Sequence, residues 1–219
     1  GRRIIDHHRK AMTFIESVHI PIAGMSLIPV LLGWPLILLP VHVVFLELII
    51  DPACSVVFEA QPEETNVMRR RPRKTDDPLF GRPMVMHSFL QGLGVLAIVF
   101  LVYIAVIWIG QSELEARAAS FATLVIANLG LISSNRNWTE SFVKTLRTRN
   151  MALWWVSGGT AMFLLLSLTV PSLQSLFRFA PLHVIDLILG LGAGALSILM
   201  SEGLKARFSR QNRMHRPST

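Results

Sequence analysis

The chain has 219 residues, of which 52% are hydrophobic and only 16% are charged, with a formal net charge of +7. A soluble domain carries about a quarter charged residues, so this composition excludes a water-soluble protein with an ordinary surface. The single cysteine, Cys54, excludes an internal disulfide framework and a zinc cluster built on thiolates. The mean hydropathy of +0.50 predicts an integral membrane protein.

Six apolar runs are long enough to cross a membrane as helices. A hydrocarbon core of about 30 Å requires about 20 helical residues, and such runs cover residues 12–32, 38–58, 84–109, 118–134, 152–170 and 182–202. A Gly-Trp-Pro sequence at 33–35 separates the first two runs and predicts a tight turn between two helices. The sequence therefore predicts an all-α integral membrane fold of six transmembrane helices, with residues 1–219 forming a single domain.

The positive charges alternate between successive connections. Apart from Arg117 and Arg178, every Lys and Arg lies before the first run, at 69–82, at 136–149 or after residue 204. Because basic residues concentrate on the cytoplasmic side of membrane proteins, both termini are predicted to be cytoplasmic. Topology thus explains the basic excess, and we expect the lipid bilayer, not a nucleic acid, to be the partner of this chain.

The second apolar run contains two carboxylates at membrane depth. Glu47 and Asp51 are four residues apart, so they share one face of a helix. Each carboxylate costs about 2.5–3.5 kcal/mol at the centre of a membrane helix and persists mainly where it lines an interior pathway. Pro52 follows directly, and a proline inside a helix frees the carbonyl four residues back, here that of Leu48. Carboxylates beside freed carbonyls favour a hard cation, so we predict a cation site here.

Structural explanations compete with this interpretation for several polar residues. Pro21 and Pro29 would free the carbonyls of Ser17 and Met25 in the first run, but prolines in membrane helices often only kink them. A lone His such as His19 or His42 is more often packed than a ligand. Glu16 lies near the predicted cytoplasmic interface, where we expect it to be solvated. The carboxylate pair itself could be held by a basic residue of another span, but no Lys or Arg lies inside any of the six runs.

Two segments and the N-terminal stalk resemble the P-type cation-transporting ATPases of the calcium and sodium pump group. Residues 40–52, which read PVH and then LELIIDP, are similar to the sixth membrane helix of that family. Residues 58–73 resemble the loop that follows this helix, and residues 1–11 resemble the stalk where the fifth helix leaves the phosphorylation domain. The resemblance implies that the chain comprises helices five to ten of a ten-helix pump.

The resemblance also implies what the chain does and what it lacks. In such pumps ATP phosphorylates an Asp in an Asp-Lys-Thr-Gly-Thr motif, and phosphorylation switches ion access between the two membrane faces. The chain contains no such motif, no nucleotide-binding domain and no actuator domain. It is expected to be the cation-binding and translocation part, joined to N-terminal domains and four further helices in a parent pump of the plasma membrane. ATP and Mg²⁺ are expected to act in that parent, so no catalytic residue and no cofactor is assigned to this chain.

The ligand positions of the family carry over unevenly. Asp51 falls on the shared aspartate of the sixth helix, and Glu47 falls where calcium pumps have Asn and sodium pumps have Asp. His19 falls on an Asn position of the fifth helix, and Asn128 is retained on the eighth. Apolar residues replace two calcium-pump glutamates, at Ile22 and Val125. The resemblance therefore implies one ion site around Glu47 and Asp51, with His19 and Asn128 as further candidate ligands.

Two other classes of function remain open from the sequence. A self-contained six-helix secondary cation carrier would use the carboxylates as its proton and substrate site, but it should show internal pseudo-symmetry, and no repeat is visible. A non-transporting membrane scaffold would leave the carboxylate pair unexplained. For the transported ion, oxygen ligands favour Ca²⁺, with Mg²⁺, Mn²⁺, Na⁺ or H⁺ as the other candidates, over soft metals.

Overall fold

The computed structural model describes residues 2–60, 81–136, 150–181 and 183–214, and within these ranges every regular element is a helix. Six helices are long and apolar enough to cross a membrane, which confirms the predicted all-α membrane fold with six spans. The predicted connections at 69–82 and 136–149, and residues 61–73 of the loop motif, lie mostly outside the described residues. The elements are α1 (Arg2–Leu32), α2 (Pro40–Pro52) with its π-helical continuation η1 (Ala53–Val57), α3 (Arg82–Trp108), α4 (Glu113–Asn135), α6 (Met151–Thr169), the short α7 (Pro171–Phe177) and α8 (Val184–Met214).

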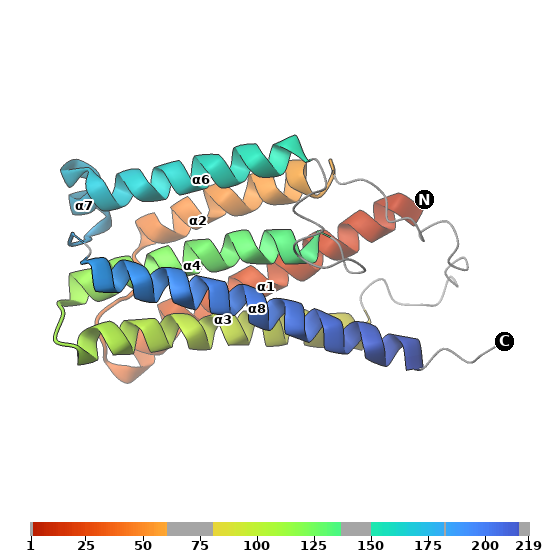
Figure 1. The fold of residues 1–219 in the computed structure, drawn as a ribbon, viewed down its shortest axis with the longest axis horizontal. Coiled ribbons are helices and arrows are strands. Elements are labelled where there is room, and N and C mark those ends of the chain that lie inside the picture. Colours follow the sequence, from red (N-terminus) through yellow and green to blue (C-terminus); the bar gives the residue numbers. More distant parts are fainter. Residues whose placement is uncertain (1, 61–80, 137–149, 182, 215–219) are drawn as a thin grey trace.

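The helices form two packing groups (Figure 1). Helices α1, α3, α4 and α8 pack against one another, whereas α2 and η1 pack against α6 and α7. Helix α4 also contacts α6, and nearly all of its residues are buried. Small residues make this central position possible: a Cβ at Gly130 would lie 2.3 Å from the Ile198 side chain of α8, so only glycine allows the two helices to approach this closely.

Arg117 ties the two groups together at the end of the bundle where α1 turns into α2. The sequence places Arg117 in a connection, but the structure places it in the first turns of α4, with its side chain buried. Its guanidinium donates to the carbonyl oxygens of Leu36 at 2.9 Å and of Arg178 at 3.2 Å. This buried cation therefore binds backbone carbonyls and does not neutralise the carboxylates of α2.

Both ends of the α2–η1 segment are hydrogen-bonded to the α6–α7 group. Near the start of α2, His42 Nε2 donates to the carbonyl oxygen of Phe177 at 2.9 Å, and its ring stacks on Phe179 at a centroid distance of 5.1 Å. At the end of η1, the N-cap residue of α6, Asn150, donates from Nδ2 to the Val57 carbonyl at 3.1 Å. These bonds fix the position of α2 along its own axis. His42 is thus packed and structural.

Candidate functional site

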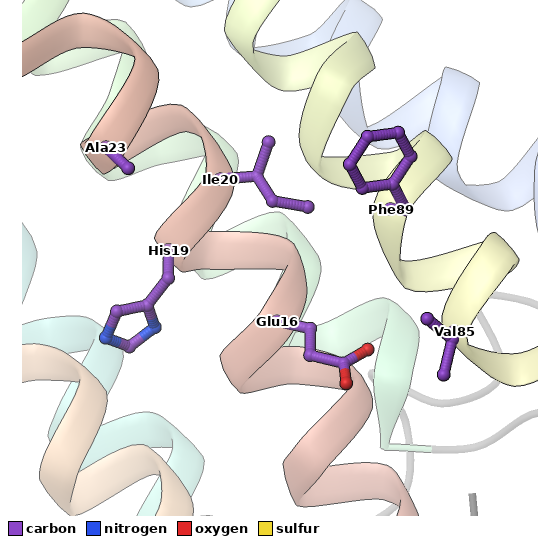
Figure 2. Close-up of a pocket in the computed structure, with 6 residues that line it drawn as sticks. All are labelled: Glu16, His19, Ile20, Ala23, Val85 and Phe89. Atoms are coloured by element: carbon purple, nitrogen blue, oxygen red, sulfur yellow. The ribbon is translucent and has the colours of Figure 1, made fainter. Parts of the chain in front are cut away.

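Glu47 and His19 meet across the boundary between the two packing groups. Helices α1 and α2 run in opposite directions from the turn at Gly33, whose φ of +67° lies in the region that favours glycine. The two facing atoms, His19 Nε2 and Glu47 Oε1, are 3.4 Å apart, and the side chains are 47% and 38% exposed. Figure 2 shows the imidazole of His19 directed from α1 toward α2. The structure therefore brings together two of the four residues predicted for the ion site.

Asp51 lies one turn further along α2, where the helix changes type. Pro52 is the last residue of α2, and the π-helical turn η1 begins at the next residue. The Ser55 hydroxyl donates to the Asp51 backbone carbonyl at 2.8 Å. The Asp51 side chain is exposed, and it forms no ion pair with the residues that the structure describes. Glu47 and Asp51 thus present two carboxylates on a surface that the described helices leave open.

Asn128, the fourth predicted residue, forms no hydrogen bond with Glu47, Asp51 or His19. It is on α4 and fully buried, and both polar atoms of its amide have no hydrogen-bond partner within the described ranges. A buried, unbonded amide costs about 1–3 kcal/mol, so Asn128 is an exception that calls for a polar partner. In the described part of the chain, no three His, Cys, Asp or Glu side chains converge as a complete metal site would require.

Glu16 is a further polar residue near the site, and the sequence gives the wrong environment for it. The sequence predicts a solvated side chain, whereas the structure holds Glu16 half-buried, with its carboxylate accepting a hydrogen bond from the Ser88 hydroxyl of α3. Glu16 and His19 line an open, mostly apolar cleft of about 360 Å³ between α1 and α3. In Figure 2 Glu16 points toward α3 and His19 toward α2. Glu16 and His19 are three residues apart and are therefore neighbours on the surface of α1, a spacing from which the sequence could have placed Glu16 near the predicted site.

The side of α1 that faces away from His19 carries a different kind of polar cluster. The Ser17 hydroxyl lies 3.2 Å from Gln91 Oε1 of α3, and Asn135 Nδ2 of α4 donates to the same oxygen at 3.3 Å. Ser17, Gln91 and Asn135 are all buried. Such interhelical hydrogen bonds between small or polar side chains hold membrane helices together. We therefore assign this cluster to the scaffold and not to the ion site.

Comparison with known proteins identifies the family. A family model described as "Cation transporting ATPase, C-terminus" matches residues 35–207. The chain therefore belongs to the P-type cation ATPases, as part of their C-terminal membrane region, and the resemblance to this family seen in the sequence is confirmed.

The relatives differ in length and in the ion that their names give. A calcium-transporting ATPase of Bacillus subtilis is 25% identical over 93% of this chain and 23% of its own length. A human potassium-transporting ATPase alpha chain 2 is 29% identical over 47% of this chain and 10% of its own. A probable cation-transporting ATPase F of Mycobacterium tuberculosis is 22% identical over 84% of this chain and 20% of its own. The chain thus spans less than a quarter of these relatives.

Proposed function

We propose that the chain is the cation-binding and translocation part of an ATP-driven pump, with one ion site built around Glu47 and Asp51. The observation that carries this proposal is the pair of carboxylates, half-exposed at Glu47 and exposed at Asp51, within the apolar candidate span Pro40–Val57. Two carboxylates at this depth cost about 5–7 kcal/mol together on insertion scales. The buried Arg117 binds carbonyls elsewhere, so a transported cation is the simplest group that compensates for this cost.

The finer details of this function follow from the same residues and from the relatives. A cation held by Glu47 and Asp51 would draw further ligands from His19, from Asn128 and from helices of the parent pump that precede this chain. Oxygen ligands and the name of the Bacillus subtilis relative favour Ca²⁺ as the starting hypothesis. ATP and Mg²⁺ would act in the N-terminal domains of the parent, in the plasma membrane, with both termini of this chain in the cytoplasm.

Replacing Asp51 in the full-length pump tests the ion site. Asp51→Asn removes the charge and keeps the size and one oxygen. We expect ion-dependent phosphorylation from ATP to fail, while phosphorylation from inorganic phosphate survives, because in pumps of this family the backward reaction requires an empty ion site. An unchanged ion dependence of phosphorylation would mean that the carboxylates are a structural pair.

Cysteine labelling tests the orientation. In a background without Cys54, single cysteines at positions 75, 144 and 210 should react with a membrane-impermeant reagent only from the cytoplasmic side. Cysteines at positions 113 and 175 should react only from outside. Labelling of position 144 from outside would contradict the orientation with both termini inside.

The upstream coding sequence separates the pump from a self-contained secondary carrier. An open reading frame that continues before Gly1 and encodes Asp-Lys-Thr-Gly-Thr would show that the chain is part of a pump. As a biochemical counterpart, purified residues 1–219 should form no acid-stable phosphoenzyme with labelled ATP. Ion-dependent phosphorylation of this fragment alone would contradict the assignment of the catalytic residues to the parent.

A further inference from the structure

We infer that the transported ion is a divalent first-row transition metal, and that His19 Nε2 binds it together with the Glu47 carboxylate. This inference rests on the proposed function, because it names the class of ion that the same site would accept. It differs from the expectation of Ca²⁺ in one respect: the site contains a nitrogen ligand as well as oxygens.

The hydrogen bond on the other side of the imidazole fixes the orientation of the ring and leaves Nε2 facing Glu47. His19 Nδ1 lies 2.8 Å from the backbone carbonyl oxygen of Ile15, one turn back on α1. A carbonyl oxygen can only accept, so Nδ1 carries the hydrogen. Nε2 is then the nitrogen that faces the Glu47 carboxylate. Histidines that bind metals nearly always donate their other N–H to a carbonyl or carboxylate in this way.

The distance between the two facing atoms fits two ligands of one ion and is too long for a charge-assisted hydrogen bond. His19 Nε2 and Glu47 Oε1 are 3.4 Å apart, which is longer than the roughly 2.7–2.9 Å of a charge-assisted N–H···O bond. Two donor atoms that each lie about 2.1 Å from a metal, at angles of about 90–109°, are about 3.0–3.4 Å from each other.

His42 shows what a structural histidine looks like in the same helix pair. Its Nε2 donates to the Phe177 carbonyl, and its Nδ1 accepts from the Leu39 backbone N–H at 2.9 Å. Both nitrogens are thus used, and the ring is buried among aromatic side chains. His19, in contrast, uses one nitrogen, is 47% exposed and presents the other nitrogen to a carboxylate.

Ligand chemistry then selects the class of ion. Ca²⁺ and Mg²⁺ take oxygen ligands almost exclusively, whereas imidazole is a common ligand for Zn²⁺, Fe²⁺, Co²⁺ and Ni²⁺ and is also compatible with Mn²⁺. One imidazole nitrogen beside the Glu47 carboxylate is the start of the mixed nitrogen and oxygen ligand sets of those metals. The remaining ligands would come from water, from backbone carbonyls near Pro52 and from the preceding helices of the parent pump.

Pulsed electron paramagnetic resonance tests the nitrogen ligand directly. The full-length pump in lipid nanodiscs is loaded with Mn²⁺, and nitrogen modulation from a coordinated imidazole is expected. His19→Asn should remove this modulation, while His183→Asn, which replaces an exposed histidine outside the site, should leave it intact. Absence of nitrogen modulation in the unmodified pump, or its persistence in His19→Asn, overturns the inference without relying on transport activity.

Ion selectivity gives the second test and separates the inference from the proposed function. In phosphorylation from ATP, Co²⁺ should activate the unmodified pump at lower concentration than Ca²⁺. His19→Asn should weaken activation by Co²⁺ about tenfold or more and activation by Ca²⁺ far less, because an amide oxygen replaces the nitrogen. If Asp51→Asn abolishes activation but His19→Asn leaves the ratio of Co²⁺ to Ca²⁺ unchanged, this inference is wrong and the proposed site stands. If neither variant changes ion activation, the proposed site is wrong as well.

Discussion

Two polar regions on opposite sides of α1 differ in how deeply their side chains are buried and in what they contact. Ser17 faces α3 and α4, where it, Gln91 and Asn135 are buried and in hydrogen-bond contact. His19, two residues further on, faces α2 and is half exposed, with one nitrogen directed at Glu47. The same helix thus carries a buried, hydrogen-bonded cluster on one side, in which Gln91 Nε2 lacks a partner among the described residues, and a partly exposed pair on the other.

This difference separates polar residues that hold the membrane domain together from those available for a ligand. The donor and acceptor of a buried hydrogen bond between helices are already paired in the folded protein, so they cannot bind a ligand as well. A partly exposed carboxylate that faces a half-exposed histidine remains accessible to a ligand. Burial alone would not distinguish the two, because Asn128 is as buried as Gln91 and yet has no hydrogen-bond partner among the described residues.

The largest effect on stability is expected in the scaffold cluster. Gln91→Ala removes the oxygen approached by Ser17 and Asn135 and leaves a cavity, so the free energy of unfolding should fall by about 1–3 kcal/mol. Thermal unfolding in detergent measures this loss, and ion activation of the full-length pump should stay within about threefold. Ser26→Ala is the matched control, because the Ser26 hydroxyl bonds only to the Ile22 carbonyl of its own helix. A large change in ion activation without a loss of stability would mean that Gln91 belongs to the ion site.

The next effect is expected at the site, on ion binding and not on stability. Glu47→Gln keeps the shape and one oxygen but removes the charge, so the concentration of ion required for half-maximal phosphorylation should rise about tenfold, or about 1.4 kcal/mol. Because the side chain is 38% exposed, the unfolding temperature should hardly change. A marked loss of stability with unchanged ion activation would make the contact with His19 structural.

A smaller effect is expected at α4. If its unbonded amide turns toward the ion, Asn128→Ala should weaken ion activation about threefold to fivefold, as for one neutral ligand among several. Val125→Ala, one turn away on the same helix, is the control and should lower stability but leave ion activation unchanged, because this position has no polar atom. If Asn128→Ala behaves like Val125→Ala, Asn128 belongs to the scaffold.

The sequence predicts the periodic features of this molecule better than its individual contacts. Apolar length and charge patterning are sufficient for the six helices, because the membrane demands about 20 apolar residues for each span. The contact between Glu16 and Ser88 joins residues of two different helices, and no spacing within one helix reveals it. In the sequence Arg117 lies directly before the fourth apolar run, so its charge assigns it to a connection. In the structure the carbonyls of Leu36 and Arg178 accept hydrogen bonds from its guanidinium, which allows the side chain to be buried.

The site shows the same division between local pattern and long-range contact. Glu47 and Asp51 are recognised from their four-residue spacing and their improbable depth, and a change of helix type follows Pro52 directly. The partner of Glu47 is less predictable, because any of several residues of α1 could face it. The orientation of His19 depends on the hydrogen bond to Ile15, which only the folded helix provides.

The two hydrogen bonds that hold the ends of α2 limit how a transport cycle could move it. A helix that slides along its axis like a piston by one turn travels about 5.4 Å, and such a stroke would break the bonds from His42 to Phe177 and from Asn150 to Val57. Rocking of α2 together with α6 and α7 breaks neither. In such a motion the distance between the His19 and Glu47 side chains would increase and decrease, so the affinity for the ion would depend on the angle between the two packing groups.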